Sequence, residues 1–397
     1  MIYLIPLLLI IFGIYKYDYR KKVIGKSVLY VLIGILLVII AGWRYRLGSD
    51  TIYYNYYFSK IPLLSELKPS DFSTTRFAPG FVVFTSFCKT LIDDVVFFQL
   101  LESLIINTAV FYFFWKNTSN VFVAILFYSL INYTDLNMEV MREALAVSVF
   151  LFSWPFLKQG KWILYCLMVL LASSFHISAM PFIFLPLIYL PVIRSFFTFG
   201  TRTWIICGVL IFVSFAIRLF FIDFIRAIAV SETVIERADA YSKDNMGGLK
   251  VLNLNGIIPV LVKLVIYPGM AIYFLNKNRK SPWKMEILSV LSMYIGVLSI
   301  GIFILARYNN YVIFFSYALL SDWMFTDLKI NFKRIKLDII GWTCVIMPFL
   351  FCASFLLYNA PTNKSRTLKT YQKYYPYSSQ IDKEKNRDRE KIIRHWR

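Results

Sequence analysis

Apolar runs long enough to cross a lipid bilayer recur along almost the whole chain, separated by short polar or basic loops. A membrane-spanning helix needs about 20 apolar residues. The pattern predicts an all-α polytopic membrane protein with about 12 transmembrane helices. The predicted spans are residues 1–15, 23–43, 97–115, 119–134, 143–158, 161–176, 178–194, 203–222, 256–275, 285–305, 309–326 and 339–358.

The composition agrees with a bilayer environment. The chain is 58% hydrophobic and only 17% charged, which is more apolar surface than a soluble domain can bury. A net charge of +20 could suit nucleic acid, but the basic residues cluster at the ends of apolar runs. We therefore expect the lipid bilayer as a partner and no nucleic acid. The five cysteines lack metal-ligand spacing and any CxxC pair, so the sequence predicts no metal and no cofactor.

The positions of Lys and Arg predict how the chain is oriented, because short cytoplasmic loops are enriched in them. Five basic loops are assigned to the cytoplasm on this ground: residues 16–22, 158–161, 194–202, 277–284 and 329–336. With these loops inside, four other segments reach the outer face: residues 44–96, 135–142, 223–255 and the turn around Arg307.

Residues 76–91 are apolar enough to suggest a further span. The segment is short, begins with Pro79-Gly80 and carries Lys89 near its end. Counting it as a span would reverse the orientation of every later loop, so we interpret it as an outer-face interfacial helix. The predicted organisation is a transmembrane domain over 1–358, with outer loops at 44–96 and 223–255.

Residues 359–397 form a polar, basic tail without apolar periodicity, which indicates disorder or a solvated helix. The number of predicted spans places this tail outside, whereas its charge favours the cytoplasm. The sequence leaves the side of the tail open.

The richest candidate site follows the second predicted span. Arg44, Arg46 and Asp50 leave the membrane together and are followed by a group of tyrosines that includes Tyr53 and Tyr54. Ionisable residues beside membrane spans often mark functional sites, and arginine forks fit phosphate geometry. Asp50 could accept a proton, and tyrosine rings could stack against sugars. The alternative is a set of snorkelling cations with an aromatic belt.

Three further polar groups are predicted to reach the same outer face. Arg142 lies three residues after Glu139, so the two could also pair with each other on one helix face. His176 could be catalytic or could cap a helix end, and Arg307 could bind substrate or a lipid headgroup. The orientation was drawn from other residues, so the convergence of these groups on one side favours a shared outer site.

With these residues identified, the chain resembles the EpsG family of Wzy-like bacterial polysaccharide polymerases over about residues 23–325. The motifs that carry the resemblance are an Arg-rich Gly-Ser-Asp loop at 44–50, Pro-Gly-Phe at 79–81, Arg-x-x-x-Ala at 142–146 and Phe-His-x-Ser at 175–178. Two positions depart from the family pattern: Ala78 replaces a common Glu, and Glu143 replaces a common Gln. An outer loop followed by interfacial helices also resembles the GT-C glycosyltransferases at the level of the fold.

The resemblance implies the transfer of a glycan from undecaprenyl diphosphate to another lipid-linked repeat unit, on the outer face of the cytoplasmic membrane. It implies a role in exopolysaccharide, capsule or O-antigen synthesis, beside a flippase and a chain-length regulator. Arginines at 44, 46, 142 and 307 would stabilise the departing diphosphate. Asp50 is the first choice for the general base and His176 the second.

Three other functions remain open on sequence grounds. A flippase or transporter for lipid-linked oligosaccharide would also need intramembrane cations, although the chain shows no repeated halves. A ligase would use the same chemistry with a different acceptor. An O-acetyltransferase would need a catalytic histidine accessible from the cytoplasm, whereas His176 is predicted to face outward.

Overall fold

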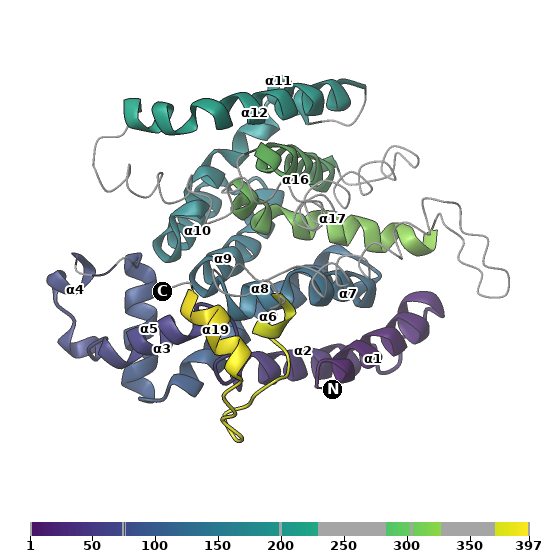
Figure 1. The fold of residues 1–397 in the computed structure, drawn as a ribbon. Helices are drawn as coiled ribbons and strands as arrows, with labels where there is room; N and C mark the ends of the chain where they lie inside the picture. Colours follow the sequence, from purple (N-terminus) through teal and green to yellow (C-terminus); the bar gives the residue numbers. More distant parts are fainter. Residues whose placement is uncertain are drawn as a thin grey trace. The chain divides into compact units, whose positions relative to one another are not determined.

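The computed structural model describes residues 2–73, 75, 77–197, 201–228, 283–301, 305–326 and 370–395. Every regular element in these ranges is a helix, apart from one isolated bridge between Arg44 and Ser379. The all-α class is confirmed for this part of the chain. Two compact units are present, one formed by Met1–Pro186 with Thr362–Arg397 and the other by Leu187–Pro361. Figure 1 shows the described helices as coiled ribbons.

The first unit holds most of the described helices. Its α-helices are α1 (Leu4–Gly13), α2 (Lys26–Gly42), α3 (Thr51–Lys60), α4 (Pro69–Ser73), α5 (Pro79–Leu91), α6 (Val95–Asn117), α7 (Val121–Ile131), α8 (Tyr133–Met138), α9 (Met141–Lys158), α10 (Trp162–Phe175) and α19 (Arg387–His395). It also holds a π-helix at Ile14–Tyr19 and short 3₁₀ helices at Leu64–Glu66 and Thr370–Lys373.

The second unit contains α11 (Pro191–Phe196), α12 (Thr201–Ile228), α16 (Trp283–Gly301) and α17 (Ala306–Thr326). Contacts join α12 to α16 and α16 to α17. Cys207 of α12 packs in one apolar cluster with Met293 and Val297 of α16.

The apolar runs of the sequence mostly become helices, but the number of membrane spans stays a prediction. Among the described residues, α6 is the one helix long and apolar enough to cross a bilayer, and several other apolar helices are shorter. The spans predicted at 256–275 and 339–358 lie outside the described residues.

The run predicted as a single span at 178–194 has a different structure. A 3₁₀ helix occupies Ile177–Tyr189, and the separate helix α11 follows it. Pro181 and Pro186 lie inside this stretch. Proline has no backbone N–H and clashes with the preceding turn of an α-helix, so it interrupts the regular hydrogen-bond ladder.

The centre of the first unit is built from α2, α6, α9 and α10, which pack in the pairs α2 with α6, α6 with α9, and α9 with α10. Tyr30 near the start of α2 donates to the carbonyl of Phe111 near the end of α6 at 2.8 Å. Ser103, earlier in α6, donates to the carbonyl of Val38, later in α2, at 3.2 Å. The two helices are therefore antiparallel.

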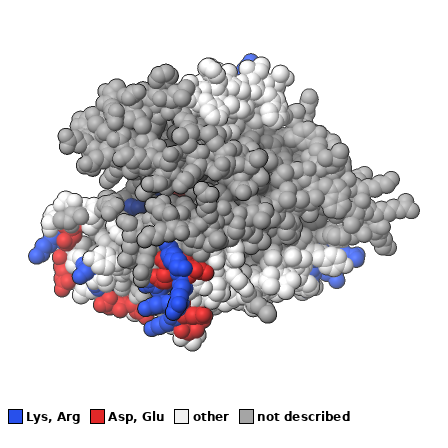
Figure 2. All heavy atoms as spheres, in the orientation of Figure 1, with Lys and Arg blue, Asp and Glu red and all other residues white. Residues whose placement is uncertain are grey.

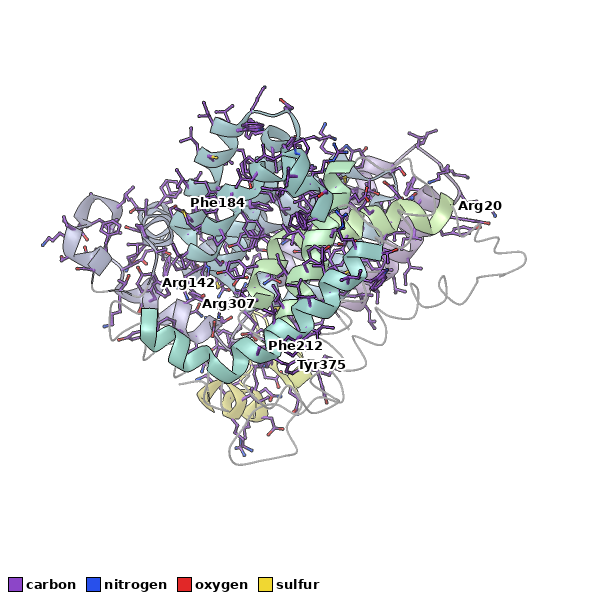
Figure 3. All side chains as sticks on the ribbon, turned by 90° about the horizontal axis from the view of Figure 1, so that it is seen from above. Arg20, Arg142, Phe184, Phe212, Arg307 and Tyr375 are labelled. Carbon is purple, nitrogen blue, oxygen red and sulfur yellow. The ribbon has the colours of Figure 1, made fainter. Side chains whose placement is uncertain are left out.

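The first unit has two distinct polar ends. At one end Lys21 donates to the Asn120 side chain at 2.6 Å, and Trp154 donates to the Asn117 side chain at 3.0 Å. The other end holds the loop after α2 and the start of α9. Figure 3 shows Arg20 and Arg142 far apart, one at each end. The helices thus separate the basic 16–22 loop from the candidate outer residues, while the orientation in a membrane stays a prediction.

Helix α5 starts directly against the end of α10. A Cβ added at Gly80 would lie 2.2 Å from Oγ and 2.8 Å from the carbonyl oxygen of Ser174, so only glycine fits this approach. The Phe84 and Phe175 rings contact one another at 6.3 Å between centroids. The 13 residues of α5 extend about 20 Å, which is less than the roughly 30 Å of a hydrocarbon core. The interfacial position of this segment stays a prediction.

We predict that Gly80→Ala lowers the stability of the purified protein by about 1–3 kcal/mol, because the new methyl group would force α5 away from α10. Gly208→Ala is the matched control, since a Cβ there meets no atom within 4 Å. Thermal unfolding in detergent measures both variants. Equal transition temperatures for the two would contradict the close packing.

Candidate functional site

The loop that follows α2 turns its first arginine into the protein interior. The Arg44 side chain is fully buried and donates to the carbonyl of Ala41 and to the sulfur of Met141. Its guanidinium lies 3.9 Å from the Glu102 carboxylate, which is also fully buried. A buried charge is tolerated only when an opposite charge or hydrogen bonds compensate it. The loop is thereby fixed to both α6 and α9.

Glu102 belongs to a row of buried polar residues on one face of α6. Glu102 lies three residues after Gln99, and Gln99, Ser103 and Asn107 follow one another at four-residue spacing; all four are buried. The Asn107 amide donates to the Asn137 side chain at 2.8 Å and accepts from the Tyr128 hydroxyl at 2.9 Å. The apolar pattern of the sequence does not predict this row, although a carboxylate inside a predicted span is itself a signal of function or of a buried partner.

The loop between α2 and α3 is also held in place near its end, at Gly48 and Ser49. Gly48 adopts a φ of +86°, and a Cβ there would lie 2.2 Å from the carbonyl oxygen of Met138. The next amide, that of Ser49, donates to the Glu139 carboxylate at 2.9 Å. Glu139 therefore positions the loop. The alternative of a Glu139–Arg142 pair is not the arrangement that the structure shows, since Arg142 contacts α3 and Phe77 as described below.

The C-terminal segment packs on this same loop. The Tyr374 hydroxyl donates to Glu139 at 2.9 Å, and the Lys373 ammonium lies 3.5 Å from the same carboxylate. Arg46 donates to both carboxylate oxygens of Glu390 at 2.7 Å, a bidentate pair. The backbone pairs as well, with the Tyr45 amide donating to the carbonyl of Ser378 at 2.9 Å.

Residues 370–395 therefore have a specific structure at the Arg44–Asp50 end of the first unit, where sequence predicted disorder or a solvated helix. Figure 1 draws this segment in yellow, and Figure 2 shows Lys and Arg beside Asp and Glu on the corresponding surface. The sequence did not determine on which side of the membrane the tail lies. In the structure, the tail and Asp50 lie at the same end of the first unit.

Next to the loop, α3 carries an aromatic surface that holds Arg142. The Tyr54 ring contacts Phe77 at 6.0 Å and Phe81 at 5.7 Å between centroids. The Arg142 guanidinium lies 4.6 Å from the centre of the Phe77 ring, and its Nε donates to the Tyr54 hydroxyl at 3.3 Å. This combines a cation–π contact with a hydrogen bond, which fixes the plane of the guanidinium.

Asp50 lies one helical turn before Tyr54. It precedes α3, and its carbonyl accepts the Tyr54 amide at 3.0 Å. Burial raises the pKa of Tyr54 to about 12, while the nearby charge of Arg142 lowers it and that of Asp50 raises it. Tyr54 is thus protonated at neutral pH, and its oxygen accepts from Arg142 while its proton is available for donation. Arg142 thus contacts the Tyr54 hydroxyl directly, whereas Asp50 contacts Tyr54 through the backbone.

The turn after α10 joins the same aromatic cluster. His176 Nδ1 lies 2.6 Å from Oγ of Ser178, and the Ser178 amide donates to that nitrogen at 3.3 Å. Phe175 packs on the apolar cluster that contains Tyr54 and Phe81. The structure therefore brings the Phe-His-x-Ser turn, the Pro-Gly-Phe start of α5 and Arg142 around one group of side chains.

The remaining sequence-predicted residues divide between the two units. Tyr53 is 43% exposed and contacts the rings of Tyr54 and Phe77. Arg307 lies in the first turn of α17, in the second unit, so its grouping with the others stays a prediction. The described residues contain no group of three or more His, Cys, Asp or Glu side chains that could hold a metal ion.

The sequence profile of the EpsG family matches residues 27–379. The chain belongs to the EpsG family. The match to EpsG covers the loop after α2, α3, α5, the start of α9, the His176 turn and part of the C-terminal segment. No curated protein and no solved structure gives a significant match. EpsG membership makes the chain a membrane protein of polysaccharide biosynthesis.

We predict that Glu102→Ala destabilises the fold by about 3–5 kcal/mol, because it leaves the Arg44 guanidinium buried without its carboxylate. Thermal unfolding of the detergent-purified variant measures the loss. The double variant Arg44→Met with Glu102→Leu should recover most of the stability, since it removes both charges and fills similar volume. A Glu102→Ala protein that unfolds at the wild-type temperature would contradict a compensating role for Glu102.

Proposed function

We propose that this protein is a Wzy-like polysaccharide polymerase, a membrane glycosyltransferase acting on the outer face of the bacterial cytoplasmic membrane. It joins undecaprenyl-diphosphate-linked oligosaccharide repeat units into a surface polysaccharide such as an exopolysaccharide, capsule or O-antigen. The observation that carries the proposal is the placement of Arg142. Its guanidinium contacts the Phe77 ring and the Tyr54 hydroxyl, and Tyr54 itself follows Asp50 by one helical turn.

The proposed reaction exchanges one anomeric bond for another. The acceptor hydroxyl attacks the anomeric carbon of the donor glycan, the bond to the diphosphate breaks, and the lipid diphosphate leaves with the bonding electrons. Arg142 stabilises the charge that grows on the diphosphate, because an oriented cation in a low-dielectric site needs little reorganisation as the reaction proceeds. Asp50 takes the proton of the acceptor hydroxyl, with His176 as the second candidate.

The aromatic surface is suited to a sugar substrate. Tyr53 exposes part of its ring beside Tyr54 and Phe77. The protonated Tyr54 hydroxyl can donate to a sugar or phosphate oxygen while it accepts from Arg142. Tyr53 and Tyr54 belong to α3, Phe77 precedes α5, and Arg142 belongs to α9. A substrate that contacts all of them would hold these three segments in one arrangement.

Arg44 and Arg46, in the loop after α2, have a structural role in this proposal. Arg44 faces Glu102 in the interior. Arg46 donates to the Glu390 carboxylate through two of its guanidinium nitrogens. We assign these two residues to holding the loop in place. Among the arginines singled out by sequence, the diphosphate contact then falls to Arg142, with Arg307 as a candidate from the second unit.

A direct assay separates the proposed polymerase from a flippase or transporter. Purified protein in detergent is mixed with lipid-linked repeat units, and the products are resolved by length. A ladder of polymers is expected, which transport cannot produce because no membrane separates two compartments. Unchanged substrate would overturn the polymerase. If a lipid-core or protein acceptor is then added, transfer to that acceptor alone would identify a ligase. The proposed cellular partners are a flippase and a chain-length regulator.

We predict that Asp50→Asn and Arg142→Ala each abolish chain extension while the protein still folds. Arg142→Lys should reduce the rate by about 100-fold or more, because an ammonium group keeps the charge but loses the planar fork stacked on Phe77. Polymer length and yield in the same assay measure the effect.

Lys60→Ala is the control for these variants. Lys60 is an exposed cation at the end of α3, and its ammonium lies 5.8 Å from the centre of the Tyr56 ring. Its removal should leave polymer synthesis unchanged. Long polymer from the Asp50→Asn or Arg142→Ala protein would remove that residue from the proposed mechanism.

A further inference from the structure

An apolar groove runs between the antiparallel helices α2 and α6, and one end of it lies away from the candidate site. Its volume is about 530 Å³. Val31, Ile35 and Leu104 contribute exposed apolar rims, while Tyr30 and Phe111 are buried in its floor. A groove with apolar walls and an open side can hold a flexible aliphatic chain.

One end of this groove is flanked by cations from both helices. The Lys26 ammonium of α2 lies 5.9 Å from the ring of Trp115, and the Lys116 ammonium of α6 lies 5.9 Å from the ring of Tyr112. Both rings line the groove. Lys26 also donates to the carbonyl of Ser119 at 2.9 Å, which holds its charge at this mouth.

The basic surface continues beyond the mouth of the groove. Lys21 and Lys22 are exposed on the turn between the π-helix and α2. Arg20 is exposed there as well and donates to the Tyr15 hydroxyl at 3.0 Å. Several cations near a membrane surface attract anionic lipid headgroups, at about fivefold in affinity for each Lys or Arg.

The length of the groove indicates how long a hydrocarbon chain it can hold. Its lining on α2 runs from Ser27 to Ile39, which is about 18 Å of helix. One leaflet of a bilayer contributes about 15 Å of hydrocarbon, half of a 30 Å core. The groove therefore matches the acyl chain of an ordinary phospholipid from a single leaflet, whereas a long polyisoprenoid chain would extend well beyond it.

We propose that the α2–α6 groove is a binding site for an anionic phospholipid, with its phosphate at Lys26 and Lys116 and one acyl chain along the groove. The lipid comes from the leaflet that borders the basic end of the first unit. The site is separate from the proposed catalytic residues, because the mouth of the groove lies at the opposite end of α2 from Asp50.

Native mass spectrometry of the full-length protein, titrated in detergent with phosphatidylglycerol or phosphatidylcholine, tests this site. One phosphatidylglycerol should bind in preference to phosphatidylcholine. The double variant Lys26→Gln with Lys116→Gln should lose about 25-fold in affinity for phosphatidylglycerol, and much less for phosphatidylcholine, because the choline group already offsets the charge of its phosphate.

The matched charge control is Lys60→Gln with Lys89→Gln. These two ammonium groups also lie near aromatic rings, at 5.8 Å from Tyr56 and 5.9 Å from Phe58. The control should bind phosphatidylglycerol as the wild type does. Equal losses in the two double variants would overturn the site, because they would reflect net charge alone.

Filling the groove tests the acyl chain independently of charge. Val31→Trp adds bulk at an exposed rim, and it should weaken the binding of both phospholipids by about tenfold or more. Gly208→Trp is the control, since Gly208 faces open space on α12. Wild-type binding by Val31→Trp would overturn the placement of the chain.

Two competitors distinguish the source of the phosphate. Excess inorganic phosphate should not displace phosphatidylglycerol, because it lacks the chain that fills the groove. A polyprenyl phosphate at equal concentration should also fail to displace it, given the length of the groove. Displacement by either compound would overturn the assignment to a phospholipid.

Discussion

The structure of the candidate site depends on one buried charge pair, that of Arg44 and Glu102. An uncompensated guanidinium in an apolar interior is strongly unfavourable, so the chain after α2 must stay where α6 supplies a carboxylate. Arg44 also contacts Met141, the residue that begins α9 directly before Arg142. The same interaction thus fixes the start of the Arg44–Asp50 loop and lies beside the backbone that carries Arg142.

The rest of the loop is held by residues distant in sequence. Glu139 binds the Ser49 amide from one side and the Tyr374 hydroxyl from the other, and Glu390 binds Arg46. These contacts fix where α3 begins, and hence where Asp50 and Tyr54 lie relative to Arg142. The C-terminal segment is therefore a structural part of the candidate site in this member of the EpsG family.

Much of the helical architecture could be predicted from sequence, because long apolar runs have few alternatives to a helix. The grouping of Asp50 with Arg142 also followed from sequence, through the placement of basic loops. Glu102 was missed because an average over an apolar run hides a single acid. The packing of the tail could not be predicted, since Glu390 pairs with an arginine 344 residues earlier. The position of Arg307 relative to these residues stays a prediction.

Asp50, Arg142 and the C-terminal segment share one end of the first unit, and we propose that this end faces away from the cytoplasm. Labelling of single cysteines in intact cells with a membrane-impermeant thiol reagent tests it, after replacement of the native cysteines. Ile381 and Ile24 are suitable sites because they are 85% and 92% exposed, one in the tail and one in the basic loop before α2. We expect Ile381→Cys to be labelled in intact cells and Ile24→Cys only after permeabilisation. The reverse pattern would contradict this orientation.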